Sequence, residues 1–190
     1  SAFSADDIQA YFSKASEMNF DITVHADQFS AGGSKVAVEF NAVSADHLEA
    51  SGDTEIGLLA QSDTISVALP GASIGLGCGF TPARKLLDAG AALAIASDHN
   101  PGSAPMGDLL TQASILGTFQ KLTNAEVLAG ITFRAAAALK LEDRGKREAG
   151  LLADLAVFHS DNYQDILYNQ GNLKPCMVWK NGALVFDRHK

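Results

Sequence analysis

Short apolar runs alternate with helix-like segments over the first half of the chain. The runs that predict buried strands cover residues 20–24, 42–47, 64–69 and 91–97. Apolar residues recur at helical spacing in residues 33–40, 54–61 and 82–89. Short strands that alternate with helices are typical of a parallel sheet covered by helices. The pattern therefore predicts an α/β fold, preceded by a helix for which Ser4 is the expected N-cap.

The second half of the chain changes character near residue 145. Helical patterns continue over residues 107–119, 124–130 and 133–139, and Thr123 with Glu126 forms the spacing of a capping box. Short strand-like runs then follow at residues 154–158, 176–180 and 184–186. Asn181-Gly182 between the last two is a strong hairpin signal. We expect one α/β domain over residues 1–145 and a small β appendage over residues 146–190.

Composition excludes several classes of protein. The chain has 190 residues, of which 47% are hydrophobic and 19% charged, so an ordinary globular protein is expected. Its formal net charge of -8 and the lack of a visible basic stripe argue against nucleic acid as a partner. No apolar run reaches the roughly 20 residues that cross a membrane, and no signal peptide is visible. Two cysteines without metal-type spacing favour a reducing cytoplasm.

Three side chains that can bind metal stand where predicted strands end. His25, His47 and Asp98 each follow a short apolar run. Taken alone, each histidine is more often a hydrogen-bonded structural residue, and Asp98 more often belongs to a turn. Taken together they are harder to dismiss, because parallel strands place their carboxyl ends around one mouth. Imidazole and carboxylate suit Zn, Fe or Mn, and a metal-bound water becomes a nucleophile near neutral pH.

Two loops invite a ligand-binding interpretation. In Asp98-His99-Asn100-Pro101-Gly102-Ser103, exposed N–H groups favour binding of a carboxylate, although an ordinary βα loop explains the same residues. The glycine-rich segment 71–79 suggests a dinucleotide site, but Phe80 replaces the third glycine and the next helix begins only at Pro82. We expect a flexible loop there.

Several motifs resemble those of the imidazolonepropionases, a group within the amidohydrolase superfamily. They are His25-Ala26-Asp27-Gln28, Ser44-Ala45-Asp46-His47-Leu48-Glu49, Leu69-Pro70-Gly71-Ala72, Asp98-His99-Asn100-Pro101-Gly102-Ser103 and Gly150-Leu151-Leu152-Ala153-Asp154-Leu155. The last motif is shared widely in the superfamily, whereas the segments around His47 and Asp98 point to this enzyme. The resemblance covers nearly the whole chain.

The resemblance implies a fold and a reaction. The chain would be the C-terminal half of a (β/α)8 barrel, strands five to eight with their helices, followed by part of a small composite β-sandwich. One divalent metal, Zn or Fe, would support hydrolysis of 4-imidazolone-5-propanoate to N-formimino-L-glutamate in histidine degradation. The enzyme would be cytoplasmic, and its full-length parent a homodimer.

The resemblance also assigns roles to residues. His25 and Asp98 would bind the metal, with Asp98 handling the proton of the attacking water. His47 would polarise the ring carbonyl or stabilise the developing oxyanion. The substrate would contact Gln28, His47, Asn100, Gly102 and Ser103. Some imidazolonepropionases carry Glu at the position of Gln28, and Gln cannot act as a base.

One expected motif is absent. The His-x-His metal pair of the first barrel strand does not occur in these 190 residues. We therefore expect a fragment that is inactive alone and is completed by an N-terminal half or by a second copy. Two alternatives stay open: another amidohydrolase of the nucleobase-deaminase kind, and a non-catalytic half-barrel that self-associates.

Overall fold

The structure is a computed structural model that describes residues 5–188. Contacts divide the chain into two compact units: residues 1–68 with 81–93, and residues 69–80 with 94–190. The expected N-cap, Ser4, lies outside the described residues, and the first helix is α1 (Ala5–Glu17). The predicted boundary at residue 145 stays a prediction.

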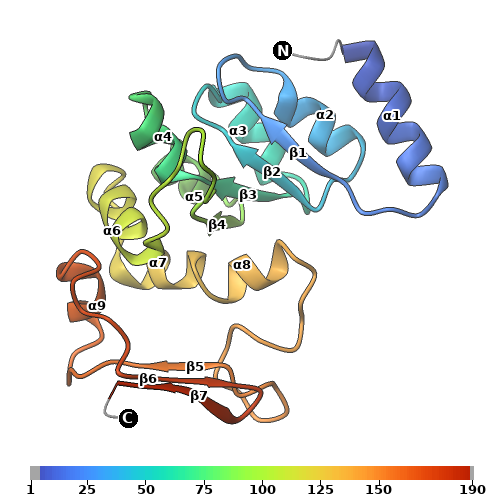
Figure 1. The fold of residues 1–190 in the computed structure, drawn as a ribbon. Helices are drawn as coiled ribbons and strands as arrows, with labels where there is room; N and C mark the ends of the chain where they lie inside the picture. Colours follow the sequence, from blue (N-terminus) through green and yellow to red (C-terminus); the bar gives the residue numbers. More distant parts are fainter. Residues whose placement is uncertain (1–4, 189–190) are drawn as a thin grey trace. The chain divides into compact units, whose positions relative to one another are not determined.

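The first unit contains strands β1 to β3, which pair in parallel (Figure 1). Its elements after α1 are β1 (Thr23–Ala26), α2 (Gly33–Glu39), β2 (Ser44–His47), α3 (Asp53–Ala60), β3 (Ile65–Ala68) and α5 (Ala83–Asp88). β1 pairs in parallel with β2, and β2 with β3. The sheet order is β1-β2-β3-β4, where β4 is Leu93–Ile95. The predicted α/β fold with a parallel sheet is therefore confirmed.

Small and branched apolar side chains make this arrangement possible. Strand residues Ala26 and Ala45 are completely buried, and the helices contribute Ala37, Leu59 and Leu86, also completely buried. Alanine on the strands lets the covering helices approach the sheet closely. Burying each leucine stabilises the fold by roughly 1.5–3 kcal/mol.

The glycine-rich segment is a helix, not the flexible loop that the sequence suggested. α4 (Pro70–Leu76) starts with proline in its first turn and ends at Gly77, whose positive φ of 66° closes the helix. The glycines within α4 allow close contact with neighbouring backbone. A Cβ added at Gly71 would lie 2.7 Å from Ser97 O, and one at Gly75 would lie 1.8 Å from Ser103 O.

The second unit continues with helices and a small antiparallel sheet. It contains α6 (Leu109–Phe119), α7 (Asn124–Gly130), α8 (Phe133–Ala137), β5 (Leu155–Val157), α9 (Gln164–Tyr168), β6 (Met177–Lys180) and β7 (Ala183–Asp187). The predicted capping box of Thr123 and Glu126 is formed. The predicted turn between β6 and β7 is also formed, with positive φ at Asn181 and Gly182. No pattern in the sequence predicted α9.

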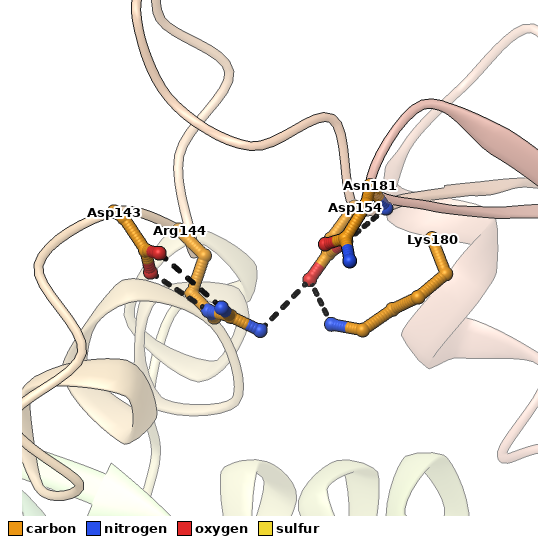
Figure 2. A network of polar contacts seen from close by, with 5 residues as sticks. All are labelled: Asp143, Arg144, Asp154, Lys180 and Asn181. Atoms are coloured by element: carbon orange, nitrogen blue, oxygen red, sulfur yellow. Dashed lines mark hydrogen bonds and ion pairs between the residues drawn. The ribbon is translucent and has the colours of Figure 1, made fainter.

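A polar network fastens the start of this small sheet (Figure 2). The carboxylate of Asp154 accepts hydrogen bonds from Lys180 Nζ, from Asn181 N–H at 2.8 Å and from Arg144 Nη1 at 3.3 Å. Arg144 Nε also donates to Asp143 at 2.8 Å. Asp154 thus ties the strand that follows it to the β6–β7 turn. The Lys180 hydrogen bond, then the Asn181 N–H, hold the pKa of Asp154 below its ordinary value.

Replacing Gly75 tests the close contact of α4. We expect Gly75→Ala to destabilise the chain by about 1–3 kcal/mol. The new Cβ would lie 1.8 Å from Ser103 O, and this backbone oxygen can move away only if the loop shifts. Gly57→Ala in α3 is the control, since its Cβ would meet no atom within 4 Å and alanine favours a helix by roughly 0.5–1 kcal/mol. Urea unfolding followed by circular dichroism measures both. Equal stabilities would contradict the contact.

The lowered pKa of Asp154 predicts a pH dependence. A carboxyl with a lowered folded pKa stabilises the protein above its unfolded pKa of about 3.9, and this contribution disappears as pH falls through the folded value. Asp154→Asn is therefore expected to melt at lower temperature than the wild type at pH 7, with the difference shrinking as the pH is lowered from about 5 to 2. Exposed Asp161→Asn is the control. A difference that stays constant with pH would refute the ionic role.

Candidate active site

The ends of β1 and β2 bring His25 and His47 together, although the register places them one position apart. His25 stands opposite Asp46, and Ala26 opposite His47, at the carboxyl ends of the two strands. His25 Nδ1 lies 2.8 Å from His47 Nε2, and the ring centroids are 4.9 Å apart with an interplanar angle of 30°. His47 is 2% exposed, whereas His25 is exposed. Two of the predicted site residues are thus in direct contact within the first unit.

The backbone after β2 turns sharply at His47. His47 and Leu48 have φ values of 84° and 71°, in the left-handed region that ordinary residues rarely occupy. Two hydrogen bonds hold this turn: Leu48 N–H donates to Ala26 O at 2.9 Å, and Thr81 Oγ1 donates to His47 O at 2.5 Å. Strained backbone that the surroundings fix in this way is often found at functional sites.

Glu49 faces the other side of the His47 ring. Its Oε2 lies 3.8 Å from His47 Nδ1, and the two side chains are 4% and 3% exposed. Among the described residues, His47 Nδ1 has no hydrogen-bond partner. Glu49 belongs to the motif quoted above but carried no predicted role, because nothing in the sequence shows that the chain reverses at His47 and Leu48.

Asp27 connects the two loops that follow the histidines. Its side chain, 3% exposed, accepts hydrogen bonds from Ser51 Oγ at 2.7 Å, from Ser34 N–H at 3.2 Å and from Ser34 Oγ. Its carbonyl accepts from Ala50 N–H at 2.6 Å. The loop after β1 is thus joined to the loop after β2, and half-buried Gln28 follows directly.

The remaining predicted residues lie in the second unit. Asn100 Oδ1 accepts from Gly102 N–H at 2.9 Å and from Ser103 N–H at 2.8 Å, while Asn100 Nδ2 donates to Asp98 O at 2.6 Å. Asn100 therefore organises the loop, and the N–H groups predicted to meet a carboxylate are engaged with its side chain. Asp98 is half-buried and has a φ of 49°.

The donor chemistry of these residues fits a divalent metal in part. The Nε2 atom of His25 and the carboxylate of Asp98 have no hydrogen-bond partner in the described part of the chain, so both can act as ligands. No group of three or more His, Cys, Asp or Glu side chains with metal-site geometry occurs in residues 5–188. Catalytic zinc sites normally use three protein ligands and a water. Additional ligands are needed to hold a metal firmly.

Comparison with known proteins decides the family. The model of the amidohydrolase family matches residues 1–185. The chain belongs to the amidohydrolase family. Similar curated members are the imidazolonepropionases of Deinococcus deserti, 40% identical over 185 residues, and of Bacillus velezensis, 39% identical over 189 residues. These matches cover 97% and 98% of this amidohydrolase chain but only 46% and 45% of the relatives, so the chain spans about half their length.

Solved structures of other amidohydrolases share the fold. An adenosine deaminase from Xanthomonas campestris with bound Zn aligns with a TM-score of 0.74 at 22% identity, over 96% of this chain and 49% of that one. A 5-methylcytosine deaminase from Klebsiella pneumoniae liganded with 5-fluorocytosine aligns with a TM-score of 0.78 at 18% identity, over 96% and 52%. At such identities the likeness concerns the fold alone. Within residues 5–188, no helix is long and apolar enough to cross a membrane.

The link through Asp27 can be tested by one isosteric change. Asp27→Asn replaces a carboxylate oxygen, which accepts from the Ser34 and Ser51 hydroxyls, by an amide that donates. We expect a loss of about 1–3 kcal/mol in the free energy of unfolding, because buried donors then lose an acceptor. Exposed Asp63→Asn should stay within about 0.5 kcal/mol of the wild type. Chemical denaturation measures both, and an equally small effect at Asp27 would contradict the link.

Proposed function

We propose that this chain supplies one half of the active site of a metal-dependent hydrolase. The reaction is the opening of the cyclic amide of 4-imidazolone-5-propanoate by water, which gives N-formimino-L-glutamate. The contact between His25 and His47 at the ends of adjacent parallel strands carries the proposal. The 40% identity to an imidazolonepropionase supports the choice of substrate over other cyclic amides.

Each residue has a distinct part in this proposal. His25 Nε2 and the Asp98 carboxylate would hold one Zn or Fe ion, which when bound would make water a stronger acid. Asp98 would accept the proton of the attacking water and pass it on. His47 polarises the ring carbonyl as an imidazolium: its Nε2 takes up a proton from solvent and donates to the carbonyl oxygen in place of its contact with His25. Gln28 hydrogen-bonds the ring without acting as a base.

The propanoate group of the substrate binds to the loop that Asn100 organises. The N–H groups of Gly102 and Ser103 point at one acceptor, Asn100 Oδ1, and are therefore already aligned for an oxygen. A substrate carboxylate takes the place of that oxygen, and Ser103 Oγ adds a further donor. A nucleobase has no carboxylate for this loop, which favours the imidazolone over a deaminase substrate.

The site requires residues beyond those described here, because two ligands hold a metal weakly. We propose that an N-terminal half, or a second copy of the chain, supplies the other ligands. Strands β1 to β4 then correspond to strands five to eight of a (β/α)8 barrel over residues 1–145. Residues 146–190 form part of a small β-sandwich. The assembled enzyme is a cytoplasmic homodimer.

Reconstitution tests the proposed reaction. The chain is joined to the portion of the Deinococcus deserti imidazolonepropionase outside its matched region, loaded with Zn or Fe, and assayed for consumption of imidazolonepropanoate. We expect turnover by the joined protein and little by the chain alone. His25→Ala and Asp98→Ala should each lower kcat/KM by about 100-fold or more, because each removes a metal ligand. Exposed His159→Ala is the matched control and should change little.

Two other results would overturn the proposal. A folded, metal-loaded joined protein that deaminates cytosine or guanine but leaves imidazolonepropanoate untouched would point to a deaminase. A chain that forms a stable oligomer in sizing chromatography, and whose joined form carries no stoichiometric metal by elemental analysis, would point to a non-catalytic self-associating module.

A further inference from the structure

Three side chains form a line in the first unit, of which those of Glu49 and His47 are buried. Glu49 Oε2 lies 3.8 Å from His47 Nδ1, and His47 Nε2 lies 2.8 Å from His25 Nδ1. The far end of this line is His25 Nε2, on an exposed residue. The turn at His47 and Leu48, both with positive φ, brings the side chain of Glu49 back beside the ring two residues earlier.

Only one proton can lie between His25 Nδ1 and His47 Nε2, so one of these nitrogens is the donor and the other the acceptor. A neutral imidazole carries a single N–H, on either nitrogen. If His25 Nδ1–H donates to His47 Nε2, then the second proton sits on His47 Nδ1 and His25 Nε2 keeps its lone pair. In the reverse arrangement His47 Nε2–H donates to His25 Nδ1. His25 then carries its proton on Nε2 and cannot offer that atom to a metal.

The surroundings of His47 Nδ1 distinguish the two arrangements. In the reverse arrangement a lone pair on Nδ1 would face the Glu49 carboxylate at 3.8 Å, with both side chains shielded from water. Two acceptors that face each other in a buried place repel, whereas an N–H that faces a carboxylate is attracted. His47 Nδ1 has no other hydrogen-bond partner in the described residues.

We propose that Glu49 is a positioning residue that fixes the proton of neutral His47 on Nδ1. Through the contact between the rings, it also fixes the proton of His25 on Nδ1 and leaves His25 Nε2 as a lone-pair donor. The inference rests on the proposed function, in which His25 Nε2 is a metal ligand. Glu49 thus determines, through His47, which nitrogen of His25 can bind a metal. Glu49 itself touches neither metal nor substrate.

Ring ¹⁵N chemical shifts of the whole chain test this assignment. The ¹⁵N-labelled protein is treated with a chelator and measured near pH 8.5, above the ordinary histidine pKa of about 6.5. Single-histidine variants assign the signals. We expect the Nδ1–H form of His47 to exceed the Nε2–H form by about tenfold or more. Glu49→Ala should reduce this ratio towards one, and Glu49→Gln, whose amide oxygen still accepts from Nδ1–H, should restore most of it.

Exposed Glu39→Ala is the matched control, since it removes a surface carboxylate of α2 that, among the described residues, pairs only with Lys35 at 3.7 Å. Its histidine signals should match those of the wild type. An Nε2–H form of His47 in the wild type would overturn the proposal, and this measurement needs no variant to fold. An unchanged ratio in Glu49→Ala, with the amide spectrum of a folded chain, would also overturn it.

The two proposals fail separately. The ring spectra involve neither substrate nor metal, so a joined protein without turnover refutes the hydrolase but leaves the role of Glu49 intact. Conversely, turnover of imidazolonepropanoate with His47 protonated on Nε2 refutes the role of Glu49 alone.

Discussion

The hydrogen-bonded ladder between β1 and β2 determines where the candidate site residues His25 and His47 lie in the first unit. It sets Ala26 opposite His47 at the edge where both strands end, and the imidazoles meet where the backbone of His47 leaves strand geometry with a positive φ. A slip of one residue would turn every side chain of one strand to the other face of the sheet. The buried alanines of these strands and the hydrogen bonds of Asp27 to the flanking loops hold this register.

Local patterns in the sequence were sufficient for much of the fold. Alternating strands and helices, the capping box at Thr123 and the turn at Asn181-Gly182 depend on neighbours within a few residues, and the structure has them all. His25 and His47 were predicted as site residues because each follows an apolar run. Parallel pairing brings the ends of both strands to one edge, but it pairs His25 with Asp46, so the contact between the two rings could not be predicted from pairing alone.

The failures concern contacts between distant residues. A glycine-rich segment is flexible in isolation, and α4 is ordered because Gly71 and Gly75 let backbone from residues 97–103 approach them. No residue near Glu49 in the sequence predicts the positive φ values of His47 and Leu48, which bring the Glu49 side chain beside the His47 ring. The inward orientation of the N–H groups of Gly102 and Ser103 was likewise hidden, because it depends on where the Asn100 side chain turns.

The close approach of Gly75 to Ser103 O limits how the ligand preference of this amidohydrolase chain can change by substitution. The loop that begins at Asp98 packs directly against the backbone of α4 at Gly75, where no side chain can be shortened or rotated to make room. The position of α4 therefore determines the path of this loop. New ligand preferences must arise from exchanging side chains on a loop of fixed course, and a shift of that course would require simultaneous changes in both segments.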